Sequence, residues 1–298
     1  MPLTPSPLRY PGGKAKLYNY IRSLIEINGL LGETYIEPFA GGSGLALKLL
    51  LKNDVKRIVI NDYDPAIYAF WHCVLNSTQQ MCDFVNTVPL TVDEWDRQHK
   101  IYLEQENHSE LELAKSVLFL NRTNISGIIN GGVIGKRDQT GKYKMDARFN
   151  RTDLVKKINA ISVLSDRIDL YNLDASAFLQ TELRHYYKSF INFDPPYVAK
   201  GGQLYKNAFS DADHEALRDQ IAACRRKWVV TYDICDLVSK LYAEYRGSYI
   251  DIYYSANGAR KSKEYIFFSD NLILPESIDI FNADLTNIAA VVESVDAP

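Results

Sequence analysis

One short segment near the N-terminus limits the fold more than any other part of the sequence. The runs at residues 34–37 and 57–61 have the length and composition of buried strands, and residues 45–51 are strong helix formers. A glycine-rich turn, PFAGGSG at residues 38–44, separates the first strand from the helix, and Asp62 ends the second strand. The order of strand, glycine turn, helix and strand predicts half of a doubly wound α/β sheet.

The alternation of strands and helices resumes in the second half of the chain. The predicted strands span residues 169–173, 189–193, 227–232, 249–254 and 264–269, and the predicted helices span residues 14–27, 152–165 and 211–226. The last two strands are close enough in sequence to form an antiparallel pair. We therefore predict a Rossmann-like α/β fold with a sheet of about seven strands.

Residues 65–157 interrupt this alternation and are predicted to form an inserted domain, with residues 1–64 and 158–298 forming the other. Helical patterns dominate as far as Asn121, and the polar segment 125–148, with five glycines, is predicted to form a hairpin-rich loop. Charge is uneven here. Residues 77–113 carry eight acids and two Lys or Arg, whereas residues 121–157 carry nine Lys or Arg and three acids. Such a basic island is either a solvated face or a surface for a polyanion.

The overall composition excludes several classes of protein. The 298 residues are 46% hydrophobic and 24% charged with a net charge of −3, which is ordinary for a globular protein. No run approaches the ~20 apolar residues of a membrane span, and the first residues lack the apolar core of a signal peptide. The four cysteines are widely spaced, so we expect free thiols, no metal, a cytoplasmic location and a monomer in solution.

The glycine turn and Asp62 together indicate a nucleoside ligand. A turn at a helix N-terminus lets a ligand approach the backbone closely, and an acid at the tip of the next strand can accept bonds from ribose hydroxyls. The turn lacks the GxGxxG spacing of dinucleotide sites, because residue 47 is Leu. Gly12-Gly13-Lys14 likewise fails as a phosphate loop, since Ala15 follows the lysine. The pattern favours an adenosine-containing ligand without a pyrophosphate.

The tetrapeptide Asp194-Pro195-Pro196-Tyr197 directly follows the predicted strand 189–193. The two prolines remove two N–H donors and fix the backbone, which leaves carbonyl oxygens there as free acceptors. The Asp194 carboxylate and the Pro195 carbonyl can then accept both hydrogens of one amino group, while Tyr197 offers a flat face to a planar ring. A rigid turn without function is the alternative interpretation.

These motifs resemble the Dam-like (D12 class) DNA adenine-N6 methyltransferases, which use S-adenosylmethionine (SAM). The resemblance rests on four blocks in one order, which are RYPGGK (9–14), IEPFAGGSG with NDYDP (36–44 and 61–65), FLNRTN (119–124) and FDPPY (193–197). The loop with Ser255, Asn257, Gly258, Arg260, Lys263 and Glu264 resembles a late hairpin of that family. The resemblance covers about residues 7–269.

The resemblance implies a bacterial or phage enzyme that methylates adenine N6 in double-stranded DNA after flipping the base out of the helix. The residues that it implies for the cofactor are Tyr10, Lys14, Phe39, Ala40, Gly41, Asp62, Asp174 and Asp194. Those that it implies for the target base are Asp194, Pro195 and Tyr197. In the inserted domain, expected to recognise the DNA target, the candidate DNA contacts are Asn130, Lys136, Arg137, Gln139 and Lys142.

Two alternatives to this function stay open at the level of sequence. One is a methyltransferase for another planar amine, such as cytosine N4, RNA adenine or a glutamine side chain; Asp rather than Ser at position 194 disfavours cytosine. The other is a catalytically inactive DNA-binding relative, which the complete set of motif residues disfavours. The recognised DNA sequence, an accompanying restriction enzyme and the role of the acidic residues 271–298 do not follow from the sequence.

Overall fold

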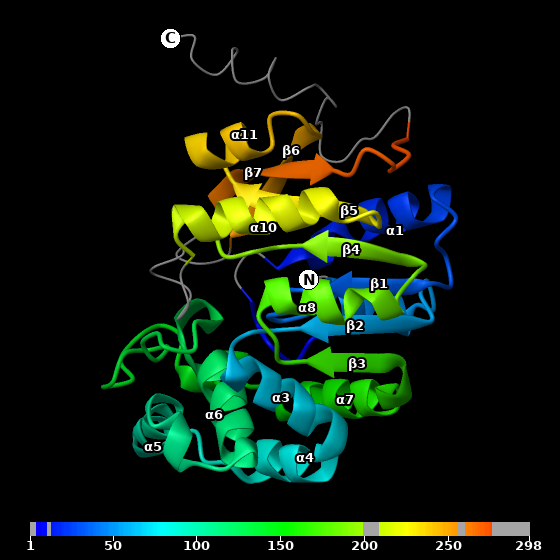
Figure 1. Cartoon of the computed structure of the whole chain (residues 1–298). Coiled ribbons are helices and arrows are strands. Elements are labelled where there is room, and N and C mark those ends of the chain that lie inside the picture. Colours follow the sequence, from blue (N-terminus) through cyan, green and yellow to red (C-terminus); the bar gives the residue numbers. More distant parts are fainter. Residues whose placement is uncertain (1–3, 11–12, 199–208, 255–259, 276–298) are drawn as a thin grey trace.

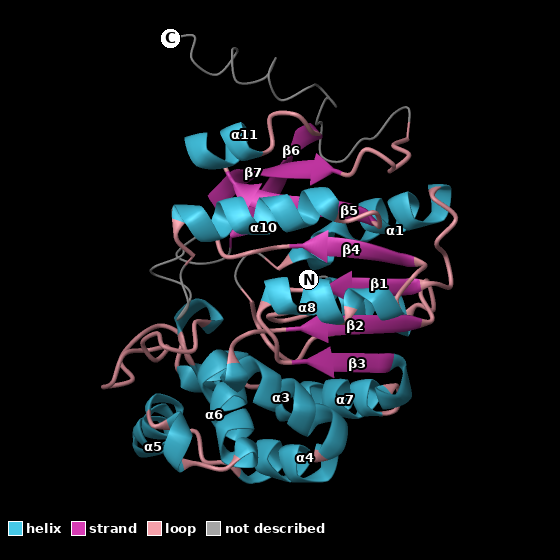
Figure 2. Cartoon of the chain, viewed as in Figure 1, coloured by secondary structure: helices cyan, strands magenta, loops and turns pink. Residues whose placement is uncertain are grey.

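A seven-stranded sheet forms the centre of the molecule, as seen in the computed structural model (Figures 1 and 2). The structure describes residues 4–10, 13–198, 209–254 and 260–275. The strands are β1 (Thr34–Glu37), β2 (Arg57–Asn61), β3 (Ile168–Tyr171), β4 (Ser189–Phe193), β5 (Lys227–Asp233), β6 (Arg246–Tyr254) and β7 (Arg260–Phe268). The predicted Rossmann-like fold of about seven strands is confirmed.

The strand order is β3-β2-β1-β4-β5-β7-β6. Strands β1 to β5 are parallel to one another, and β7 runs antiparallel to both β5 and β6, as predicted for the last pair. The chain builds the sheet outward from β1 in one direction and from β4 in the other. The order therefore reverses between β1 and β4, and ligands of open α/β sheets bind at the carboxyl edge of such a switch point.

Helices cover both faces of the sheet (Figure 1). They are α1 (Tyr18–Ile27), α2 (Gly44–Leu51), α3 (Pro65–Asn76), α4 (Thr78–Thr87), α5 (Val92–Leu103), α6 (Glu110–Thr123), α7 (Arg151–Ser162), α8 (Ala175–Thr181), α10 (Asp211–Ala223) and α11 (Asp236–Leu241). Because strand side chains alternate between faces, Tyr35 joins the core with α1 and α2, whereas Ile36 joins the core with α8, α10 and α11. No helix in the described part of the chain has the length and apolar character needed to cross a membrane.

Helices α3 to α7 form the helical part of the predicted insertion. The ends of two of them are well specified: Asp64 caps α3 with Pro65 in its first turn, and Ser109 and Glu112 form a capping box on α6. The core of this part is continuous with one face of the sheet, because one cluster contains Phe119 and Trp95 as well as Ile60 of β2. The division into two domains stays a prediction.

The predicted hairpin within residues 125–148 is only partly correct. One isolated antiparallel bridge joins Asn124 to Val133, and the rest of the segment consists of turns and 3₁₀ helices rather than strands. The Gln139 side chain explains part of this difference. Its Nε2 donates to the carbonyls of Ile134 and Lys136, and its Oε1 accepts from the Met145 N–H, so side-chain bonds replace strand pairing.

Element boundaries differ from the predictions by a few residues. The predicted helix 14–27 begins as a 3₁₀ turn over Lys14–Leu17. Strand β3 stops at Tyr171, two residues early, because Asn61 Oδ1 accepts the N–H of Leu173 in place of a strand partner. Strand β6 begins at Arg246, three residues early, and its pairing with β7 starts there.

Candidate active site

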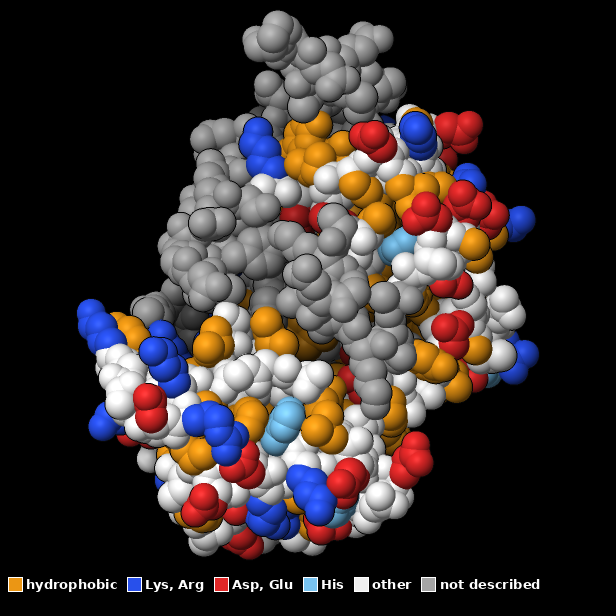
Figure 3. Space-filling model, turned by 90° about the vertical axis from the view of Figure 1, so that its left-hand side faces the viewer, with side chains coloured by type: hydrophobic (Ala, Val, Ile, Leu, Met, Phe, Trp, Pro, Cys, Tyr) orange, Lys and Arg blue, Asp and Glu red, His pale blue; other side chains and the backbone are white. Residues whose placement is uncertain are grey.

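The carboxyl ends of β1 and β4 meet at the switch point of the sheet. Strand β4 ends at Phe193, and Asp194 is the next residue; strand β1 ends at Glu37, directly before the glycine turn. Figure 3 looks onto this edge of the molecule, and Lys and Arg side chains are exposed over its lower, helical part. The two most informative sequence motifs therefore lie side by side, where the topology predicts a ligand.

Lys14 ties together the side chains around Asp194. Its Nζ donates to Asp194 Oδ1 at 2.7 Å and to the Tyr197 hydroxyl at 2.8 Å, and it lies 3.3 Å from Glu264 Oε2. Lys14 is only 5% exposed, so these contacts are protected from solvent. The structure thus joins the first and last sequence blocks, RYPGGK and FDPPY, in one cluster.

The charges in this cluster determine which groups are ionised. Burial alone would lower the pKa of Lys14, but Asp194 and Glu264 outweigh it and raise that pKa, so the ammonium stays charged. Burial raises the pKa of Asp194 above its usual value; Lys14 acts against this and Glu264 adds to it.

Asp194 uses one carboxylate oxygen for the protein and keeps the other open. Both Lys14 and Thr231, whose Oγ1 lies at 2.9 Å, donate to Oδ1. Among the described residues, no hydrogen bond to Oδ2 is found, and the side chain is 26% exposed. Asp194 is therefore held in one orientation, with an acceptor oxygen available to a ligand.

The glycine turn is held by three other elements. Gly41 has φ +46°, and its N–H donates to Asp62 Oδ2 at 2.7 Å while its carbonyl accepts from Trp71 Nε1 at 2.9 Å. The Tyr10 ring packs directly on the turn, since a Cβ on Gly41 would lie 2.7 Å from that ring. Both the backbone conformation and the close approach of Tyr10 explain the glycine.

The remaining predicted cofactor residues lie around this turn or at the end of β3. Burial raises the pKa of Asp62 to about 7, and its Oδ1 accepts the Asp64 N–H. Ala40 is buried, and Phe39 packs edge-on against Phe209. Asp174 is exposed and caps α8 through the N–H groups of Ser176 and Ala177.

Three residues of the site were not among the sequence candidates. Thr231 and Glu264 contact the Asp194 cluster from β5 and β7. Glu37 at the end of β1 is bonded by the Tyr35 hydroxyl, and burial raises its pKa to about 8. Glu37 lies in the second sequence block and Glu264 in the late hairpin, but neither of them was predicted to have a role at the site.

The first sequence block also contacts the third. Asn121 accepts the Arg9 N–H at 2.7 Å and donates to the Arg9 carbonyl at 2.8 Å. Gly127 has φ +80°, and a Cβ there would lie 2.6 Å from the Arg9 carbonyl oxygen. Arg9 and Tyr10 therefore connect the glycine turn with the loop that follows α6.

That loop, residues 125–148, projects from the molecule on the side of the carboxyl ends of the parallel strands (Figure 1). Arg137 forms two 2.7 Å bonds to Asp96 of α5, and its guanidinium lies over the Trp95 ring. Asn130 contacts His99 of the same helix at 3.2 Å. Among the predicted DNA contacts, Arg137 and Asn130 are thus anchored to α5.

The other three predicted DNA contacts, Lys136, Lys142 and Gln139, differ in the contacts that they make within the protein. Lys136 has φ +64° at a turn, and the Lys142 ammonium lies over the Tyr143 ring. The Gln139 amide is occupied within the loop by the bonds described above. The structure therefore gives Gln139 an internal role, and its contact with DNA stays a prediction.

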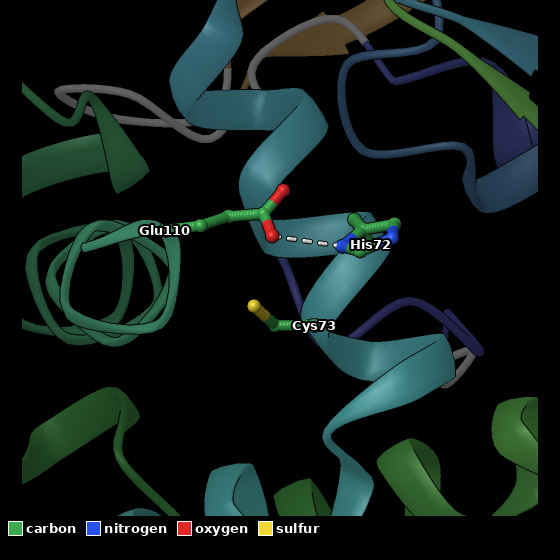
Figure 4. Close-up of side chains that lie close together, drawn as sticks. All are labelled: His72, Cys73 and Glu110. Atoms are coloured by element: carbon green, nitrogen blue, oxygen red, sulfur yellow. Dashed lines mark hydrogen bonds and ion pairs between the residues drawn. The ribbon is translucent and has the colours of Figure 1, made fainter.

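One group of side chains has the composition of a metal site but packs as a helix contact. Candidate ligand atoms of His72, Cys73 and Glu110 lie within 4.8 Å of one another. Figure 4 shows that the His72 ring and the Glu110 carboxylate point toward each other, and Nδ1 and Oε2 are 2.9 Å apart. Burial raises the pKa of Cys73 to about 11, which keeps it a thiol. We assign this group to the joining of α3 and α6.

Comparisons with known proteins found similar chains, among them one methyltransferase and two solved structures. The Type II methyltransferase M.MjaIII of Methanocaldococcus jannaschii is 23% identical over 206 residues, 64% of this chain and 68% of that protein. An uncharacterized protein of Listeria monocytogenes serotype 4b is 8% identical with a TM-score of 0.35, over 87% of this chain and 72% of its own. A conserved hypothetical protein of Streptococcus pyogenes is 10% identical with a TM-score of 0.32. The match covers 85% of this chain and 96% of that protein.

The family comparison covers most of the chain. Residues 10–255 match the sequence pattern of the D12 class N6 adenine-specific DNA methyltransferases, a span that includes the glycine turn, Asp62 and Asp194. The resemblance drawn from the sequence motifs is confirmed. The chain belongs to the D12 class N6 adenine-specific DNA methyltransferase family.

Proposed function

We propose that the protein transfers a methyl group from SAM to the N6 amino group of an adenine flipped out of duplex DNA. The observation that carries this proposal is the open Oδ2 of Asp194, next to the Pro195 carbonyl at the carboxyl end of β4. Two acceptors in adjacent residues match the two hydrogens of one amine.

The residues around the glycine turn fit a nucleoside that carries a positive charge. Asp62 would accept ribose hydroxyls, Asp174 would lie near the adenine, and Tyr10 and Lys14, with residues 39–41, would border the methionine end. Asp194, Glu264 and Lys14 together carry one net negative charge, which would suit a cationic sulfur bound nearby. Bound SAM would supply an activated methyl group.

Asp194 then has two tasks in the reaction. Adenine N6 is a poor nucleophile because its lone pair is delocalised into the ring. Bonds from N6–H to Asp194 Oδ2 and the Pro195 carbonyl favour a pyramidal nitrogen and orient its lone pair. Asp194 takes the proton once the methylated nitrogen becomes cationic. Tyr197, whose hydroxyl Lys14 already fixes, presents its ring to the base.

Basic side chains beside the site support a duplex substrate. Residues 121–157 carry nine Lys or Arg and three acids. This excess of positive charge suits DNA phosphates, which position a protein, while Arg137 and Asn130 are candidates to read bases. Base flipping costs a few kcal/mol, which stacking on Tyr197 partly offsets.

The test compares Asp194→Ala and Asp194→Asn with the wild type. Labelled SAM is supplied with duplex DNA, single-stranded DNA or RNA, and the modified base is identified by mass spectrometry. We expect N6-methyladenine from duplex DNA, no turnover by the Ala variant and residual turnover by the Asn variant, whose amide oxygen still accepts. Duplex affinity of both variants should stay near that of the wild type, because phosphate contacts supply most of it.

Three outcomes would contradict the proposal. Methylation by the Ala variant at the wild-type rate would remove Asp194 from the mechanism. Modified cytosine, or a preference for RNA, would replace the proposed substrate with one of the alternatives. A folded wild type that binds duplex DNA but does not transfer methyl groups would be an inactive relative.

A further inference from the structure

Glu264 occupies an unusual place for a carboxylate. It lies on β7, an interior strand of the sheet, opposite Asp233 of β5 and Ile250 of β6, and it is 1% exposed. A buried carboxylate is costly unless a cation or hydrogen-bond donors compensate it. Its Oε2 lies 3.3 Å from Lys14 Nζ, the ammonium that also bonds Asp194 and Tyr197.

Glu264 is linked to Asp194 through Lys14, which contacts both carboxylates. Glu264 holds Lys14 from the side of β7, Lys14 bonds Asp194 Oδ1, and Thr231 bonds the same oxygen. Without Glu264, the ammonium would lose one of its two neighbouring carboxylates and would neutralise the Asp194 carboxylate more completely. We propose that Glu264 is a positioning residue that divides the charge of Lys14 between two carboxylates. The Asp194 Oδ2 atom thereby stays available to the substrate amine, an inference that rests on the proposed function.

Loss of Glu264 should shift the pKa of Asp194 in one direction, which a pH profile can detect. The negative charge of Glu264 disfavours ionisation of Asp194, so its removal lowers the pKa of Asp194. The other titratable side chains that interact with Asp194 are Lys14, Glu37, Tyr35 and Tyr232. Loss of Glu264 also lowers the pKa of Lys14, which Glu264 raises. The acidic limb of the kcat profile, where Asp194 must ionise to accept N6–H, should therefore move to lower pH.

The experiment measures kcat and KM of Glu264→Gln, Glu264→Asp and the wild type across pH. For the Gln variant we expect kcat to fall about tenfold, the effect of ~1.4 kcal/mol, with KM for SAM and DNA nearly unchanged. Its acidic limb should move down by about one pH unit. The Asp variant keeps the charge, so it should keep the wild-type limb and recover part of kcat. Asp270→Asn, which removes an exposed carboxylate just beyond β7, is the matched control.

Each result separates this inference from the proposed function. A wild type without methyl transfer overturns the function itself and is assayed first. An active wild type together with a Gln variant of unchanged kcat and unchanged pH profile overturns only the role of Glu264. If the Gln variant does not fold, the Asp variant decides, because its shorter side chain lengthens the contact with Lys14. A Glu264→Asp variant with the kcat and the thermal stability of the wild type would then contradict the inference.

Discussion

Asp62 illustrates how one side chain can serve both the fold and a ligand. Its two oxygens accept the N–H groups of Gly41 and Asp64, so it holds the glycine turn. The ribose contact that its position predicts would use lone pairs beyond those two bonds, since each carboxylate oxygen can accept more than one.

Asp62→Ala should weaken SAM binding by ~1.5–3 kcal/mol, because a charged acceptor is lost. Isothermal titration calorimetry measures the change. Trp71→Phe is the control, since it removes the bond to the Gly41 carbonyl and some core packing but keeps the ribose acceptor. Unchanged affinity in a folded Asp62→Ala variant, or an equal loss in the control, would exclude the ribose contact.

Glu37 should make stability depend on pH. Burial raises its pKa in the folded protein to about 8 from 4.5, so the folded state retains a proton that the unfolded chain releases. A raised pKa stabilises the fold at pH values below the unfolded pKa, and that stabilisation is lost as the pH rises from about 4.5 to about 8. Urea denaturation of the wild type and Glu37→Gln over this range measures it. The difference between their free energies of unfolding should change steadily with pH, and parallel curves would contradict the prediction.

At the scale of elements, local sequence patterns were sufficient to predict the strands of the sheet. The strand, glycine turn and helix around residue 41 and the strand before Asp194 follow from composition and period, which act over a few residues. The loop after α6 was harder to predict, because its shape depends on Gln139 and on the pairing of Arg137 with another helix. The contact of Lys14 with Asp194 spans 180 residues of sequence. No local pattern contains such a contact. Thr231 was therefore not predicted, and Glu264 was noted only as part of the late hairpin and not as a neighbour of Asp194.

The pair formed by Arg137 and Asp96 gives a prediction for the loop. If Arg137 contacts DNA, Arg137→Ala weakens duplex binding, whereas Asp96→Ala releases the guanidinium and strengthens it. An exposed ion pair contributes little to stability, so the loop should stay folded in both variants. Fluorescence anisotropy over a salt series, with a randomised duplex library for sequence preference, measures both effects.

The pattern of loss identifies the kind of contact that Arg137 makes. A loss of ~1–3 kcal/mol at one base position indicates that Arg137 reads a base edge, and an even loss with a shallower salt dependence indicates a phosphate. Equal weakening by both substitutions would show that the pair acts only within the loop.

At the scale of the whole molecule, the helical part and the sheet share one apolar core. We therefore expect a single unfolding transition, although an inserted domain with its own core would show two. Two variants test this. Both carry Trp71→Phe, and each also has one of the other two tryptophans replaced by Phe. The one tryptophan that remains, either Trp95 in α5 or Trp228 in β5, reports unfolding by its fluorescence. Their fluorescence midpoints in urea should coincide, and well-separated midpoints would support independent domains.

The burial of Lys14 also has a consequence for biosynthesis. A ribosome releases residue 14 long before the chain reaches Asp194 and Glu264, and N-terminal regions generally fold first. The ammonium cannot leave water until both carboxylates have emerged, because burying it alone would cost several kcal/mol. The first segment of the nascent chain must therefore wait for β7, the last strand in the described part of the chain, and the Asp194 cluster is complete only when synthesis has passed β7.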